Sequence, residues 1–495
     1  MTGITTHDIA VILPHLVVLG GAILVLLWDA FHPSSCRVCA TWIGAAALLV
    51  ATALFYQTPT GIAATSTMFA FTAFGDAILI DGMAVFAGML ICAIALVTVL
   101  VAEGYLAARD LSIGEFQAML LFSTFGMLMM VSSNHLIVIF ASLETLSLAL
   151  YVLIGFRKTH SDSAEAAVKY FLLGGFASAF FLYGVALVYG KTGSVLLGSE
   201  LAFTVSPMVR VGVALLIVGI AFKISAVPFH LWTPDVYQGA PTPTTGFLAA
   251  ASKTAAVVVL LRIVYPAVAT DGALWGDLWP WMAAITMIVG NLIALVQHDV
   301  KRVLAYSSIA HVGFILMALA GGTSVTVGGH SALFYLVAYV LGTIGAFAAI
   351  SAIAGDEEDR VDLDQIRGLA RSHPLLAGLL ALFLLSLSGL PPLVGFAGKL
   401  FAFKSAITGG LYYLAIFAAL NSAMAVYYYL RIIIRMYMEG RAKPLTFKMT
   451  PVAYLPLLLV AAAVIYVGIA PGAFLAAAEM SVRALAPMAS LAWLP

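Results

Sequence analysis

The sequence predicts an all-α, polytopic membrane protein, and three observations support this fold class. Of its 495 residues, 63% are hydrophobic and only 9% are charged. Its mean hydropathy is +1.08. Apolar runs recur along the chain at about 20 residues, the length that crosses a bilayer as a helix. Because the formal net charge is +0, the chain offers no basic surface for nucleic acid, and the expected surrounding is the lipid bilayer.

Fourteen apolar runs are long enough to be transmembrane helices. No basic residue precedes the first run, so that run lacks the start of a secretory signal and should be retained in the protein. The runs cover residues 9–28, 40–57, 78–102, 114–132, 134–156, 163–190, 205–233, 242–265, 275–297, 302–320, 328–354, 374–403, 407–430 and 452–475.

The distribution of basic residues predicts the orientation of the chain. Loops after the odd-numbered runs hold fourteen Lys and Arg residues, whereas the opposite side, with its helix ends, holds five, one of them Arg262. The positive-inside rule places the richer side in the cytoplasm. Both termini are then periplasmic, and we expect a multi-pass protein of a bacterial inner (plasma) membrane, with an organellar membrane as the alternative.

A weak internal repeat divides the chain into four parts. An offset of 163 residues aligns Asn134–His135 with Gln297–His298, and Ser225–Pro228 with Ser388–Pro391. The spacing of the apolar runs agrees with this offset. Because each repeat holds five helices, an odd number, the second copy should be inverted across the membrane, as in many transporters. We therefore predict a three-helix segment (1–113), a first repeat (114–270), an inverted second repeat (271–438) and a final helix with its tail (439–495).

Prolines interrupt the seventh and twelfth runs. Pro228 lies in the seventh run, five residues after Lys223, and Pro391-Pro392 lie in the twelfth, a few residues before Lys399. A proline inside a helix frees backbone carbonyls that protein, water or cations must satisfy. A simple kink is the alternative, but two interruptions at matching positions, each close to a lysine, favour broken helices 7 and 12 with a functional role.

Once charges near the ends of the apolar runs are assigned to loops and helix ends, five charged residues remain inside the runs: Glu144, Lys169, Lys223, Lys253 and Lys399. A charge at the centre of a membrane helix costs about 2.5–3.5 kcal/mol on insertion scales, and such residues usually face a protein interior or a wet cavity. Glu144 is the only carboxylate that we place in the middle of a run. These residues are therefore candidates for moving ions or protons.

A buried lysine and a nearby carboxylate make a proton switch, because burial favours the neutral amine and the carboxylate restores the charged form. We predict that Glu144 pairs with Lys223. Lys253 and Lys399 would continue the line across both repeats, with His311 between them, since histidine transfers protons near neutral pH. A hydrogen-bonded packing role for His311 is the alternative.

Lys169 lies nearer the cytoplasmic end of its run and is open to two interpretations. It either belongs to the same relay or extends its side chain to the membrane surface. The sequence contains no glycine-rich nucleotide loop, no iron–sulfur cysteine cluster and no serine–histidine–acid pattern. The Cys36–Cys39 pair lacks the second ligand pair of a structural zinc site. We therefore expect no metal or cofactor in this chain.

Four segments resemble the N-type antiporter-like subunits of proton-pumping NADH:quinone oxidoreductase, respiratory complex I. They are residues 165–184, 222–242, 305–311 and 389–396, and the resemblance extends over essentially the whole chain. It implies fourteen helices, two inverted five-helix repeats, a glutamate on helix five, and lysines on helices seven, eight and twelve.

The implied functional positions are all occupied in this sequence, by Glu144, Lys223, Lys253 and Lys399, and Lys169 fits the helix-six lysine of the N type. Lys399 stands where M-type subunits have a glutamate. The chain also stops without the lateral helix of L-type subunits. One departure from symmetry remains, because Lys223 precedes its proline whereas Lys399 follows its own.

The resemblance implies a subunit that translocates protons without redox chemistry of its own. Other subunits of the complex would bind NADH, FMN, iron–sulfur clusters and quinone, and the neighbours would be M-type and K-type subunits. Three alternatives stay open at this point. They are a cation/proton antiporter without electron transfer, a scaffold that has lost pumping, and the related subunit of a ferredoxin-linked photosynthetic complex.

Overall fold

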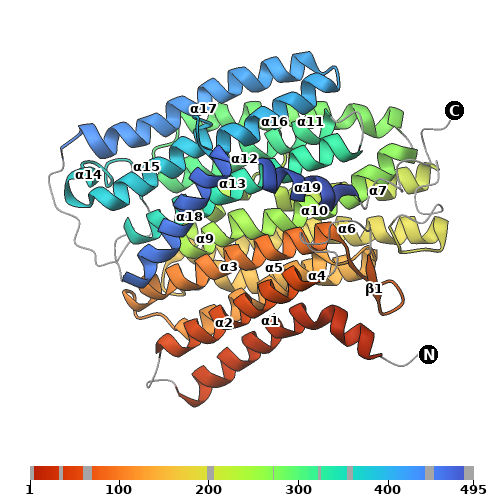
Figure 1. Ribbon diagram of the computed structural model, residues 1–495, viewed down its shortest axis with the longest axis horizontal. Coiled ribbons are helices and arrows are strands. Elements are labelled where there is room, and N and C mark those ends of the chain that lie inside the picture. Colours follow the sequence, from red (N-terminus) through yellow and green to blue (C-terminus); the bar gives the residue numbers. More distant parts are fainter. Residues whose placement is uncertain are drawn as a thin grey trace.

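Long helices run side by side along the length of the molecule (Figure 1). The computed structural model describes residues 5–32, 37–58, 70–197, 206–270, 272–321, 325–353, 361–440 and 451–483. Within these residues, 12 helices are long and apolar enough to cross a membrane, or up to 13 if one bent pair is a single span. The chain is therefore a multi-pass membrane protein, and its helical fold class is as predicted.

The predicted count of fourteen spans is not confirmed. The run predicted at 374–403 is divided between α15 (Pro374–Ser388) and α16 (Val394–Thr408), which have 15 residues each. The last span is bent by 85° between α18 (Pro451–Ile469) and α19 (Gly472–Arg483). Pro471, which lacks a backbone N–H, lies in this bend.

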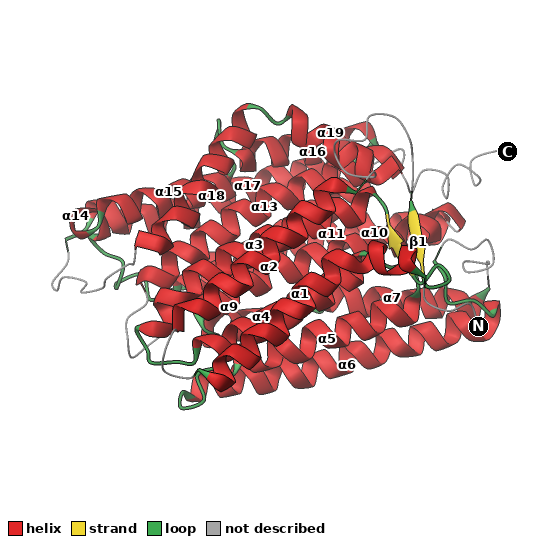
Figure 2. Ribbon diagram, turned by 60° about the horizontal axis from the view of Figure 1, so that its bottom comes forward, coloured by secondary structure: helices red, strands yellow, loops and turns green. Residues whose placement is uncertain are grey.

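Helices α1 (Thr6–Phe31) and α2 (Arg37–Gln57) form one edge of the molecule, opposite α17 (Tyr412–Met438) (Figure 1). Helix α3 (Gly82–Ala107) lies further toward the centre. A two-stranded hairpin, β1 (Phe71–Ala73) with β2 (Ile78–Ile80), precedes α3 at one end of the helices (Figure 2). The sequence reasoning missed this hairpin because strands of three residues leave almost no alternating pattern.

The remaining helices follow in two groups. The first group is α4 (Ile113–Val131), α5 (Leu136–Ile154), α6 (Ser161–Thr192), α7 (Pro207–Ile224), α8 (Thr233–Gly239), α9 (Thr242–Phe247), the π-helical turn η1 (Leu248–Ser252) and α10 (Lys253–Thr270). The second group is α11 (Gly272–Leu295), α12 (Val300–Ala320), α13 (Val325–Ile353), α14 (Leu369–Ser372), α15, α16 and α17 (Tyr412–Met438).

The helices differ in burial, so that some form the centre of the molecule and others its outer surface. The span formed by α9, η1 and α10 is buried throughout its most apolar stretch, and α12 and α13 are nearly so. By contrast, α1, α2, α6 and α17 expose rows of large apolar side chains. Apolar exposure of this extent is suited to lipid tails or to neighbouring membrane proteins. Charged groups on the central helices are therefore shielded from the bilayer.

Two local structures of the first group recur in the second. A Cβ on Gly126 would lie 2.6 Å from Leu146 N, and a Cβ on Gly290 would lie 2.6 Å from Ala310 N, so only glycine permits either close helix contact. A pair of backbone hydrogen bonds at the start of α5 also reappears at the start of α12. They run from Leu136 N to Val195 O (2.8 Å) and Leu197 N to Asn134 O (2.7 Å), and from Val300 N to Val361 O (2.8 Å) and Leu363 N to His298 O (3.0 Å).

Candidate functional site

Three lysines predicted from the sequence lie in the interior. Lys223 on α7, Lys253 at the start of α10 and Lys399 on α16 are only 2%, 1% and 5% exposed. Their ammonium groups are bonded to hydroxyl and carbonyl oxygens. Within the described part of the chain, none of the three forms an ion pair with a carboxylate.

Lys223 lies in the last turn of α7, where the helix stops. Ser225 adopts a left-handed backbone (φ 66°) and ends the helix before the proline at 228. Lys223 Nζ donates to Ser147 Oγ (2.8 Å) and Tyr170 Oη (3.2 Å), and lies 4.9 Å from the centre of the Tyr170 ring. A cation at a helix C-terminus is also favoured by the helix dipole.

The predicted ion pair between Glu144 and Lys223 is absent from the described structure. Ser147, one turn further along α5, occupies the contact position beside Lys223 instead. The Glu144 Oε1 atom is buried and has no hydrogen-bond partner in the part of the chain that the structure describes. Buried carboxylate oxygens normally have a partner, so this atom is suited to bind water or a neighbouring donor.

Lys253 follows the π-helical turn η1, which sequence reasoning did not predict. The Ala249 carbonyl within this turn accepts a hydrogen bond from Tyr339 Oη (3.0 Å). Lys253 Nζ donates to Ser308 Oγ on α12, which also bonds to Tyr339 Oη (2.7 Å) and Tyr237 Oη (3.3 Å). Through Ser308, hydrogen bonds therefore link this lysine to two tyrosine hydroxyls.

His311 lies one turn after Ser308 on α12, and both of its ring nitrogens are hydrogen-bonded. Nδ1 bonds to Tyr335 Oη (2.7 Å) and Nε2 to Tyr429 Oη (3.2 Å). A hydroxyl group can donate or accept, so these partners suit either tautomer of the ring. The hydrogen bonds satisfy a packing histidine and would equally serve proton transfer.

Lys399 lies on α16, just after the interruption that separates α15 from α16. Its Nζ donates to the Ser388 carbonyl (2.7 Å) at the end of α15 and to Ser422 Oγ (2.8 Å) on α17. The carbonyl has no intrahelical partner at a helix end, so the ammonium satisfies it. Gly389 has φ +86°, and a Cβ there would lie 2.7 Å from Lys399 Cδ, so the side chain requires glycine at this position.

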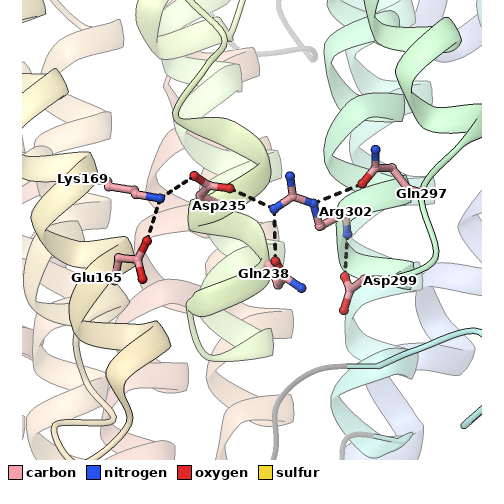
Figure 3. A network of polar contacts seen from close by, with 7 residues as sticks. All are labelled: Glu165, Lys169, Asp235, Gln238, Gln297, Asp299 and Arg302. Atoms are coloured by element: carbon pink, nitrogen blue, oxygen red, sulfur yellow. Dashed lines mark hydrogen bonds and ion pairs between the residues drawn. The ribbon is translucent and has the colours of Figure 1, made fainter.

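Lys169 lies apart from the three buried lysines, in the ion-pair cluster of Figure 3. Its side chain is 40% exposed, and Nζ lies 2.7 Å from both Glu165 Oε1 and Asp235 Oδ2. Asp235 Oδ1 lies 2.8 Å from Arg302 Nη1. This cluster connects α6, α8 and α12. Sequence reasoning did not identify Asp235 or Arg302, because both lie next to predicted run boundaries.

One buried ion pair was also missed. Arg262 was assigned to a helix end, but it lies within α10 and is paired with Asp81, and each side chain is only 3% exposed. The guanidinium donates to both carboxylate oxygens at 2.9 and 2.8 Å and to the Val131 carbonyl at 3.0 Å. An arginine inside the run predicted at 242–265 was the signal that could have identified it.

The placement of possible metal ligands in the described residues bears on whether the chain could hold a metal ion. Among the described residues, no group of three or more His, Cys, Asp or Glu side chains is placed to hold a metal ion. Cys36, the first residue of the pair singled out in the sequence, lies outside the described residues.

Comparisons with known proteins identify the family of this chain. The family described as NADH:quinone oxidoreductase/Mrp antiporter matches residues 133–425. NADH-quinone oxidoreductase subunit N of Trichlorobacter lovleyi is 37% identical over 488 residues, which are 97% of this chain and 98% of that protein.

Solved structures extend the likeness to three dimensions. A chain of respiratory complex I from Thermus thermophilus is 35% identical, with a TM-score of 0.80 over 94% of this chain and 100% of that chain. A chain of the Mrp complex from a Dietzia species has a TM-score of 0.85 over 99% of both chains, but at 20% identity it shows the fold alone.

The helical fold and the family match thus define an antiporter-like membrane subunit. The chain belongs to the NADH:quinone oxidoreductase/Mrp antiporter family, among the N subunits of NADH-quinone oxidoreductase.

Proposed function

We propose that this chain is a proton-translocating membrane-arm subunit of NADH:quinone oxidoreductase, in which protons move along Glu144, Lys223, Lys253, His311 and Lys399. The observation that carries the proposal is the environment of the three lysines. Each is buried, and each is bonded to a hydroxyl group rather than to a carboxylate.

Hydroxyl partners suit a lysine that gains and loses a proton. An ammonium group has three donors and no acceptor, whereas a neutral amine can also accept a hydrogen bond. Ser147, Ser308 and Ser422 can serve both states, because a hydroxyl can donate or accept. A fixed carboxylate would stabilise only the charged state. Water between the hydrogen-bonded groups would complete the path.

The two predicted five-helix repeats, 114–270 and 271–438, are part of this proposal. The recurring contacts support an offset of 164, because Gly126 matches Gly290 and Leu146 matches Ala310. This offset is one residue longer than the value taken from the sequence. It places Ser308 at the position of Glu144, so the two halves would carry different charges at matching sites.

The position of Lys399 is a second place where the two repeats would differ in charge. At the same offset Lys399 corresponds to Asp235, which lies on α8 after the interruption of the seventh span, as Lys399 lies on α16 after that of the twelfth. The matching positions therefore hold opposite charges. Inverted repeats with interrupted helices are typical of transporters with a site at the repeat interface.

Electron transfer would take place in other subunits, which would bind NADH, FMN, iron–sulfur clusters and quinone. The neighbours in the membrane would be M-type and K-type subunits. We place the complex in a bacterial plasma membrane with both termini of this chain on the periplasmic side, as the excess of basic residues in the opposite loops favours.

A cation/proton antiporter is the second candidate, and the shared fold with the Mrp complex favours it. It predicts sodium- or potassium-dependent proton transport in vesicles without NADH. The identity of 37% to an N subunit over almost the whole chain favours the oxidoreductase instead.

Replacement of Lys223 with alanine tests the relay. We expect Lys223→Ala to assemble but to lose both NADH:quinone activity and proton pumping, measured together in inverted membrane vesicles. The exposed Lys404, on α16, is the matched control, and Lys404→Ala should retain both. If Lys223→Ala oxidises NADH and pumps protons normally, Lys223 is not part of the relay and the scaffold interpretation gains support.

A further inference from the structure

The short helix α8 touches the partners of two buried lysines. At its N-terminal end, the Trp232 ring lies 4.7 Å from the Tyr170 ring, and the Tyr170 hydroxyl accepts from Lys223. Further along, the Tyr237 hydroxyl bonds to Ser308, the residue that accepts from Lys253. A displacement of α8 would therefore disturb the surroundings of both lysines.

Ion pairs attach α8 to the helices on either side. Asp235 shares its carboxylate between Lys169 on α6 and Arg302 on α12, one oxygen to each, at 2.7 and 2.8 Å (Figure 3). Arg302 also donates to Gln238 Oε1 (3.1 Å) on α8 and to Gln297 Oε1 (3.1 Å). Asp235 is thus held from the first group of helices and from the second.

The chain on both sides of α8 is not helical. Residues 225–232 separate it from α7, and Ala240 and Pro241 separate it from α9. Other contacts hold these segments, among them Lys301 Nζ to the Ala240 carbonyl (2.7 Å). Within α8 itself, Thr245 Oγ1 donates to the Tyr237 carbonyl (3.2 Å), and Asp235 forms the ion pairs of the helix with α6 and α12. Segments that flank a short helix in this way are suited to small rotations of it.

We propose that Asp235 is a positioning residue for proton transfer between Lys223 and Lys253, because it holds α8 with Trp232 and Tyr237 against the two lysine sites. This inference rests on the proposed relay. In the cluster, Glu165 and Asp235 balance Lys169 and Arg302. Without the Asp235 charge, the two cations lose the carboxylate between them and repel one another.

Because the ion-pair cluster around Asp235 is partly exposed, we expect it to position α8 rather than to stabilise the fold. The Asp235 side chain is 37% exposed. Water screens such ion pairs, so their contribution to stability is small. A shift of about 1 Å at a reacting group can nonetheless slow a reaction about a hundredfold. Loss of Asp235 is therefore expected to impair transfer before it impairs assembly.

The test uses the whole complex in inverted membrane vesicles. We expect Asp235→Asn to lower proton pumping and coupled quinone reduction about tenfold, with KM for NADH unchanged. The solvent deuterium isotope effect on quinone reduction should increase, because proton transfer becomes rate-limiting. Asp235→Glu should restore most of the activity. Glu165→Gln, which removes a carboxylate from Lys169 without touching α8, should stay close to the wild type.

A second variant keeps the test decisive if Asp235→Asn does not assemble. Tyr237→Phe removes the contact to Ser308 and leaves the ion pairs intact, and it should show the same slower pumping and larger isotope effect. Normal pumping by an assembled Asp235→Asn, or by Tyr237→Phe, together with a loss in Lys223→Ala, would overturn the role of α8 and leave the relay standing. Normal pumping in all of these variants would overturn the relay itself.

Discussion

Arg262 and Lys253 lie on the same helix, α10, and are both almost fully buried, yet their partners differ in kind. Arg262 meets the Asp81 carboxylate with two hydrogen bonds at 2.9 and 2.8 Å. Among the described residues, Lys253 is hydrogen-bonded only to the hydroxyl and carbonyl oxygens of Ser308. The two cations are therefore alike in burial and differ in the charge of their partner, and the proposed relay uses only the one with neutral partners.

The difference has a physical basis. A buried bidentate pair between a guanidinium and a carboxylate keeps both groups ionised, because each stabilises the charge of the other. Arg262 cannot deprotonate in a protein, so such a site has one state. A buried lysine with hydroxyl partners has two states of more similar free energy, since desolvation offsets the intrinsic preference for the charged form. A lysine that transfers protons requires a site of this kind, in which both of its protonation states are accessible.

The first prediction breaks the structural pair. Arg262→Met leaves the Asp81 carboxylate buried without its cation, which costs about 3–5 kcal/mol and should sharply lower the amount of assembled complex on a native gel. The double variant Asp81→Asn/Arg262→Met removes both charges and should recover much of the assembly. A single Arg262→Met variant that assembles like the wild type would show that the pair is not structural.

Part of the candidate site could be predicted from the sequence because charged residues are rare in this chain. In a chain with 9% charged residues, the lysines at 223, 253 and 399 stand out because apolar runs surround them. The prolines at 228 and 391–392 lie between α7 and α8 and between α15 and α16. Composition and spacing are enough for such features, because the bilayer penalises charges and free carbonyls wherever they occur.

The partners of these lysines were not predictable in the same way. Ser147, Tyr170 and Ser308 are ordinary residues in a membrane helix, and they become partners only through the packing of one helix against another. The same reason accounts for the missing Glu144–Lys223 contact, since a helix position does not specify which neighbour a side chain meets. The π-helical turn before Lys253 had no sequence pattern that we recognised.

The second prediction sharpens the functional side of the comparison. Ser308→Ala removes the hydroxyl that accepts from Lys253 and should slow pumping about two- to tenfold, the effect of one hydrogen bond, without loss of assembly. Ser351→Ala is the matched control, because that buried hydroxyl bonds to the Phe347 carbonyl of its own helix. Equal effects of the two variants on pumping would remove Ser308 from the relay.

The third and smallest effect concerns an exposed pair. Glu479 and Arg483 lie one turn apart on α19, 2.9 Å from each other, with side chains 45% and 59% exposed. Because water screens such a pair, Glu479→Gln should change stability by less than about 0.5 kcal/mol, and the thermal midpoint of the purified complex should stay the same. A clear drop in that midpoint would mean that another subunit buries this face of α19. The pair would then belong with Arg262 and Asp81 as a structural charge.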